Sequence, residues 1–149
     1  MYERILVPYD GSATSEAALA EAVRLAKLCS ARLRLIHVVD PLTHISGFEV
    51  GSVYAREILP GLLAAGDALL EKARAPIEAQ GLAVESELIQ SSGERVARIV
   101  VEQAESWKAD LVVIGTHGRR GIDRVLMGSD AELVARTSPV PVLLVRAQR

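Results

Sequence analysis

The sequence predicts an α/β protein in which a five-stranded parallel sheet carries helices on both faces. Short Val, Ile and Leu runs of strand length alternate along the chain with longer amphipathic stretches of helical length. One run, Leu111-Val112-Val113-Ile114, has no polar position, as expected for a strand that is buried on both faces. The length of 149 residues is that of one ordinary domain. We therefore expect residues 1–149 to form a single domain around one sheet.

Two strands and one helix are predicted in the first third of the chain. Arg4–Tyr9 is a predicted strand with an apolar Ile-Leu-Val centre. Ser12 is a residue type that caps helix N-termini, and the apolar spacing after it predicts a helix over Ala13–Ser30. Arg32–Val39 alternates apolar and basic residues before it becomes fully apolar, which predicts the second strand. Asp40–Ser52 follows as a long predicted loop, and such loops are often functional.

The middle of the chain holds one long helical pattern and a third strand. The helix is predicted over Val53–Gln80, with a kink or break because Pro60 and Pro76 lie inside it. Gly81 is a residue type that ends helices. In Leu82–Gln90 apolar and acidic residues alternate, which predicts a strand nearer the edge of the sheet.

Two more helix and strand pairs complete the pattern. Gly93–Trp107 is a predicted helix, Asp110–Gly115 a strand, Ser129–Arg136 a helix and Pro141–Val145 the last strand. A strict alternation of strands and helices favours a parallel sheet with right-handed crossovers.

Composition excludes several classes of protein. Seventeen basic and nineteen acidic side chains give a net charge of −2, which together with the 3% aromatic content argues against nucleic-acid binding. No apolar stretch is long enough to span a membrane. Cys29 is the only cysteine, so neither a disulfide framework nor a cysteine-based zinc site is expected. With an N-terminus that leads straight into a strand, these features predict a cytoplasmic protein.

The residues around the fourth predicted strand carry the chemistry. Ligands of open parallel sheets bind at the carboxyl ends of the strands. Gly115 and Gly118 let the backbone approach a ligand closely. Gly128 and Ser129 then open a helix whose free N–H groups favour phosphate, and Arg119 can balance its charge. A glycine-rich turn before a capped helix, without any ligand, is the alternative that this pattern leaves open.

Other nucleotide and hydrolase motifs are absent. The sequence has no Walker-type phosphate loop, no dinucleotide fingerprint after the first strand and no nucleophile elbow. Ser12, His117 and Asp10 contain the residue types of a catalytic triad, but nothing in the sequence activates the serine. We therefore assign no catalytic residue and no protein metal ligand.

The spacing of these glycines resembles that of a known family. Gly115-x2-Gly118-x9-Gly128-Ser129 matches the ATP-binding pattern of the universal stress protein family, nine-residue spacer included. The resemblance covers the whole chain, and three further segments carry it. Ile5–Ser12 resembles the family's first strand and acidic turn, His37–Asp40 the end of its second strand, and Ser138–Val145 its last strand.

The resemblance implies a Rossmann-like fold of the adenine nucleotide alpha hydrolase type, with ATP held between the ends of the first and fourth strands. Asp10 would lie beside the ribose and adenine, and the backbone of Val38 would pair with the adenine edge. The phosphates would carry Mg²⁺ or Mn²⁺. The candidate ATP-binding residues are Pro8, Asp10, Val38, Gly115, His117, Gly118, Arg119, Gly128, Ser129 and Asp130. Of these, His117 lies between the paired glycines, where an exposed loop histidine is the alternative.

Two positions depart from the commonest form of the family. Tyr9 stands where a small or β-branched residue is usual, and Asp130 stands where a neutral residue is usual. Asp130 adds a negative charge near the phosphates, where it could also bind metal or favour the helix N-terminus. These departures bear on nucleotide affinity, whereas the fold does not depend on them.

The leading functional hypothesis is an ATP-binding regulatory protein of the stress response that works as a nucleotide-dependent switch. A slow ATPase or another adenine-nucleotide-processing enzyme is one alternative, and a protein-interaction module without nucleotide is another. We also expect a homodimer formed through the C-terminal strand, because Val142–Val145 would otherwise leave an apolar edge bare. A protein partner of unknown identity fits the switch hypothesis, whereas nucleic acid and membranes do not.

Overall fold

The predicted α/β architecture is confirmed. The computed structural model describes residues 1–41, 54–117 and 127–147. Its five strands are all parallel and lie in the order β3-β2-β1-β4-β5. They are β1 (Arg4–Pro8), β2 (Arg32–Val39), β3 (Val84–Gln90), β4 (Leu111–Gly115) and β5 (Val142–Val145). The strand order reverses between β1 and β4, which is where parallel sheets of this kind bind ligands.

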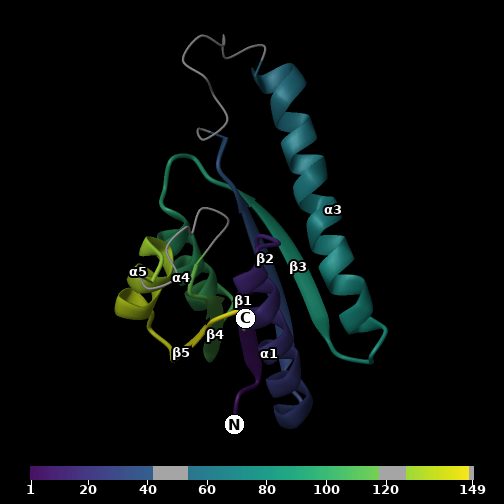
Figure 1. Cartoon of the computed structure of the whole chain (residues 1–149), viewed down its shortest axis with the longest axis vertical. Coiled ribbons are helices and arrows are strands. Elements are labelled where there is room, and N and C mark those ends of the chain that lie inside the picture. Colours follow the sequence, from purple (N-terminus) through teal and green to yellow (C-terminus); the bar gives the residue numbers. More distant parts are fainter. Residues whose placement is uncertain (42–53, 118–126, 148–149) are drawn as a thin grey trace.

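Helices cover both faces of the sheet (Figure 1). The helices are α1 (Ala13–Cys29), α3 (Leu59–Glu78), α4 (Val96–Ser106) and α5 (Ser129–Thr137), and a π-helical turn, η2 (Tyr54–Ile58), leads into α3. One core joins α1 and α3 to the sheet, and a second core joins α4 and α5 to the opposite face. No helix in the described ranges is long and apolar enough to cross a membrane.

Successive side chains of β1 point to opposite faces of the sheet, and both faces are covered. This explains why the central strands are unbroken apolar runs in the sequence. Ile5 and Val7 belong to the core under α1 and α3, whereas Leu6 belongs to the core under α4 and α5. All three side chains are fully buried. A strand covered on both faces has no solvent-facing position, so every residue must be apolar. The predicted edge position of β3 is also confirmed, and its exposed Glu85 and Glu87 reflect it.

The helix predicted over Val53–Gln80 differs from α3 at its start. The helical segment opens as the π turn η2 and becomes α-helical at Leu59, so Pro60 lies in the first turn of α3. The first turn of an α-helix tolerates proline, because the fixed φ of its ring suits this position. No break occurs at Pro76, which lies near the end of α3, and its carbonyl accepts a hydrogen bond from the side chain of Gln80 at 3.0 Å.

The helix predicted over Gly93–Trp107 is shorter than expected, because α4 begins only at Val96. Gly93 has a φ of 106°, a left-handed conformation that no helix contains. The Ser91 hydroxyl donates to the Glu94 carbonyl at 2.9 Å and accepts from the Gly93 N–H at 3.2 Å. Side chains that bond to nearby backbone in this way favour a turn over a helix. The predicted loop over Asp40–Ser52 falls, from residue 42 onward, outside the described residues.

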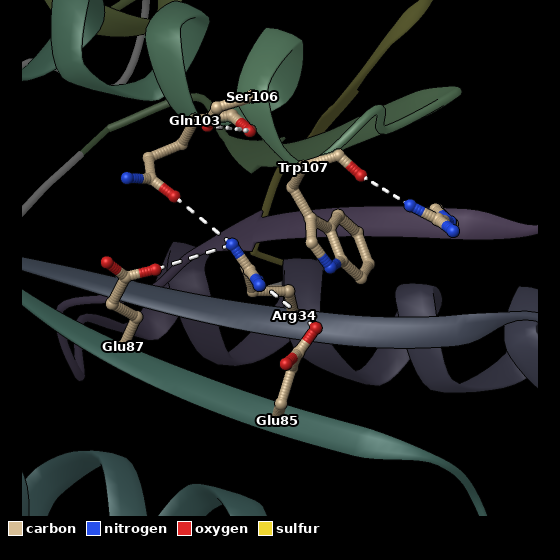
Figure 2. Close-up of polar contacts among 7 residues, drawn as sticks. Arg34, Glu85, Glu87, Gln103, Ser106 and Trp107 are labelled. Carbon is tan, nitrogen blue, oxygen red and sulfur yellow. Dashed lines mark hydrogen bonds and ion pairs between the residues drawn. The ribbon is translucent and has the colours of Figure 1, made fainter.

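A cluster around Arg34 joins β2, β3 and the carboxyl end of α4 (Figure 2). The guanidinium of Arg34 lies 4.9 Å from the centre of the Trp107 ring. It also pairs with Glu85 at 3.2 Å and Glu87 at 3.4 Å, and donates to the Gln103 side chain at 3.4 Å. Helix carboxyl ends lie at the amino ends of the strands in such a fold, so this cluster lies away from the carboxyl ends, where ligands of such sheets bind.

Candidate functional site

The carboxyl ends of β1 and β4 gather most of the predicted site residues. Pro8 ends β1, Gly115 ends β4, and Ser129 opens α5. The hydroxyl of Thr14, in the first turn of α1, donates a hydrogen bond to the carbonyl of His117. The segments that follow the two central strands are therefore in direct contact. Gly118 and Arg119 lie outside the described residues.

The turn after β1 is fixed by its own side chains. The Asp10 carboxylate accepts from the Ser12 N–H at 2.9 Å, which forms an Asx turn. The Ser12 hydroxyl in turn caps α1 by accepting from the Ser15 N–H at 3.2 Å, as its residue type predicted. This turn holds the Asp10 carboxyl group beside the start of α1.

Packing against α1 requires a glycine at position 115, independently of any ligand. A Cβ atom at this position would lie 2.7 Å from the carbonyl carbon of Thr14 and 2.8 Å from its carbonyl oxygen. Backbone atoms at such distances cannot be accommodated without movement of the helix. The first turn of α1 therefore rests directly on the end of β4, which the sequence pattern alone did not indicate.

The chain returns to β4 at the start of α5. The Gly128 N–H donates to the Thr116 carbonyl at 2.7 Å, and a Cβ at Gly128 would lie 3.1 Å from that oxygen. Gly128 is also the N-cap residue of α5, and having no side chain it supplies no side-chain cap. The first N–H groups of α5 are thus left for another acceptor, and the positive end of the helix dipole favours an anion there.

Asp130 connects α5 to α4. Its Oδ1 accepts a hydrogen bond from the Ala97 N–H, in the first turn of α4, at 3.3 Å. Arg95, the N-cap residue of α4, makes no side-chain hydrogen bond to that helix. The Asp130 carboxylate therefore lies at the amino ends of both α4 and α5, a role that the sequence did not reveal.

The turn before α4 is another feature that sequence reasoning missed. The buried Ser91 donates its N–H to the Val39 carbonyl at 2.8 Å, which ties the turn to the end of β2. Hydrogen bonds from its own backbone N–H and from that of Ser92 lower the pKa of the Glu94 carboxyl group. The Ser-Ser-Gly-Glu composition was the available signal, since these residue types form such turns.

Tyr9 belongs to the core under α1 and α3. Its hydroxyl donates to the Glu16 carboxylate, and its side chain is buried. The Nδ1 atom of His37 lies 2.8 Å from the Tyr9 carbonyl, so that nitrogen carries the proton because a carbonyl can only accept. His37 packs under Gly66 of α3, where an added Cβ would lie 3.2 Å from its ring. Both side chains therefore stabilise the ends of β1 and β2.

Comparison with known proteins identifies the family. The model of the universal stress protein family matches residues 1–146. This chain belongs to the universal stress protein family. A curated relative, universal stress protein MJ0531 of Methanocaldococcus jannaschii, is 35% identical over 147 residues, which are 98% of this chain and 83% of the relative.

Solved structures of universal stress proteins have the same fold. UspA from Lactobacillus plantarum superposes with a TM-score of 0.82 at 25% identity, and the match covers 97% of this chain and 98% of that one. A universal stress protein in complex with cAMP superposes with a TM-score of 0.71 at 26% identity, over 99% of both chains. The second of these proteins holds an adenine nucleotide.

The donor set at the start of α5 suits a phosphate in this universal stress protein. The N–H groups of its first turn and the Ser129 hydroxyl are hydrogen-bond donors, as phosphate oxygens require. No three His, Cys, Asp or Glu side chains come together as a metal site in the ranges that the structure describes.

Proposed function

We propose that this universal stress protein binds ATP at the carboxyl ends of β1 and β4 and acts as a nucleotide-dependent switch in the stress response. One observation carries the proposal. The Gly128 N–H bonds to the Thr116 carbonyl at 2.7 Å and so holds the start of α5, which has no side-chain cap, against the end of β4. The complex of a similar protein with cAMP supports an adenine nucleotide as the ligand.

The adenine and ribose occupy the side of the site formed by β1 and β2. Ile36 is the last residue of β2 that is paired with β1, whereas β2 itself continues to Val39. Val38 thus lies beyond the end of β1, where its backbone pairs with the adenine edge. Pro8 and Asp10 border the same space, with Asp10 beside the ribose.

The phosphates occupy the side formed by β4 and α5. Gly115, His117 and Gly128 border them, Gly118 and Arg119 complete the glycine pattern in sequence, and the Ser129 hydroxyl donates to a phosphate oxygen. The phosphates bind Mg²⁺ or Mn²⁺. Asp130 lies next to this charge, and its hydrogen bond to Ala97 makes it the connection through which the occupied site acts on α4.

Calorimetric titration with ATP and magnesium tests the proposal. We expect the wild-type chain to bind ATP and Ser129→Ala to bind it about tenfold more weakly, because a hydrogen bond to a charged phosphate is lost. Thr137→Ala, at the opposite end of α5, is the matched control and should leave the affinity unchanged. Absence of binding at millimolar ATP in the wild type would contradict the proposal and favour a protein-interaction module.

We also propose that two copies pair through β5 in the cytoplasm. β5 lies at one edge of the sheet, and its four residues are only partly buried. A second copy would cover this edge, whose unpaired backbone and apolar side chains otherwise favour aggregation. Static light scattering at micromolar concentration should give the mass of a dimer. A monomer mass across the whole concentration range would remove this part of the proposal.

A further inference from the structure

A cavity of about 160 Å³, open to solvent, lies on the surface beside α5 and the N-cap residue of α4. It is lined by Arg95, Ser129, Glu132, Leu133 and Arg136. Ser129 is the first residue of α5, so the cavity adjoins the place assigned above to the phosphates. Its volume is several times the roughly 30 Å³ that one water molecule takes up in the liquid, which leaves room for a phosphoryl group.

Most charged side chains at and near this cavity have a partner among the described residues, and Arg95 is the exception. Glu132 pairs with Arg136 at 3.5 Å, so these two side chains offset each other. The Asp130 carboxylate bonds to the Ala97 N–H, and the Glu94 carboxylate accepts from the Ser92 N–H at 2.8 Å. Arg95 pairs with no carboxylate in the part of the chain that the structure describes.

The backbone of Arg95 lies between a hydrogen-bonded turn and the first turn of α4. The Ser91–Glu94 turn precedes it and is anchored to β2 through the Ser91 N–H. The residue itself is the N-cap of α4, with extended backbone at φ −67° and ψ 141°. The Arg95 side chain is exposed and lines the cavity, where its guanidinium can bind a phosphate through two parallel N–H···O bonds, a geometry that arginine favours.

We propose that Arg95 binds the terminal phosphate of the nucleotide and thereby makes this chain prefer triphosphates to monophosphates. The inference rests on the proposed function, since it places the first phosphate at the start of α5. A longer phosphate chain continues past Ser129 into this cavity. A monophosphate ends before the cavity and gains nothing from Arg95.

Titration with AMP, ADP and ATP, each with magnesium, tests this by comparing the wild type with Arg95→Gln. We expect the variant to bind ATP about tenfold more weakly and AMP with unchanged affinity, because only ATP loses a charged contact. Arg98→Gln is the matched control. Arg98 lies on the same helix, pairs with Glu102 at 2.8 Å and does not line the cavity.

The outcomes separate this inference from the proposed function. An equal loss for AMP and ATP, or no loss for either, overturns the role of Arg95 and leaves nucleotide binding in place. Inorganic tripolyphosphate is a second probe, and tighter binding to the wild type than to Arg95→Gln supports the subsite even where no nucleotide binds. A wild-type chain that binds neither the nucleotides nor tripolyphosphate overturns both proposals.

Discussion

Gly115→Ala should lower the free energy of unfolding by about 2–3 kcal/mol, the upper part of the range for overpacking. The added methyl group would lie 2.7–2.8 Å from the carbonyl carbon, carbonyl oxygen and hydroxyl oxygen of Thr14. Two of these atoms are backbone, so relief requires the first turn of α1 to move off β4. That movement would also break the hydrogen bond from Thr14 to the His117 carbonyl. Urea denaturation followed by circular dichroism measures the change.

Gly61→Ala is the matched control for this substitution. Gly61 lies in α3, and among the described residues no atom beyond its chain neighbours and the helix's own backbone lies within 4 Å of a Cβ built there. Alanine is the better helix former, so this variant should be more stable than the wild type by about 0.5–1 kcal/mol. If Gly115→Ala unfolds at the same urea concentration as the wild type, α1 does not rest on β4 as described. ATP affinity should fall in Gly115→Ala and stay constant in Gly61→Ala.

Trp107→Ala should lower the free energy of unfolding by a comparable amount, about 2–3 kcal/mol. The indole packs against the core under α4 and α5, and truncation removes that apolar contact. It also removes the ring over which Arg34 lies at 4.9 Å (Figure 2). The Arg4 guanidinium lies 6.0 Å from the centre of the same ring. The loss is smaller than for a fully buried tryptophan because Trp107 is only half-buried.

A double-mutant cycle separates packing from the interaction with the guanidinium. Arg34→Met keeps much of the aliphatic side chain but removes the charge. The coupling energy between positions 34 and 107 should be about 0.5–1 kcal/mol, the usual range for a cation–π pair near the surface. Trp107→Phe retains a ring and should retain part of the coupling. Equal urea midpoints for Trp107→Ala and the wild type would show that this cluster does not stabilise the fold.

The local pattern of apolar and polar residues was sufficient to predict most of the fold. The apolar runs of β1 and β4 could be read as buried strands because both faces of a central strand contact helices. The start of α4 was predicted three residues early, at Gly93 instead of Val96. The pattern of residue types did not show this boundary, which is set by the positive φ of Gly93 and the hydrogen bonds of Ser91.

The candidate site was predictable only where its residues are close in sequence or follow a known spacing. The Asx turn of Asp10 and the cap at Ser12 involve neighbours along the chain. The bond between Asp130 and Ala97 joins residues 33 positions apart, and the contact of Gly115 with Thr14 depends on how α1 packs on the sheet. Such contacts arise from tertiary packing, which residue types and spacing do not encode directly.

The Trp107 cluster has a practical consequence for studying this chain. Trp107 is the only tryptophan, so tryptophan emission comes from a single place, at the carboxyl end of α4. That place is at the amino ends of the strands, whereas the candidate site is at their carboxyl ends. Fluorescence therefore reports unfolding around the amino ends of the strands. The heat of a titration reports ligand binding at their carboxyl ends. The two signals can distinguish a variant that has lost its ligand from one that has lost its fold.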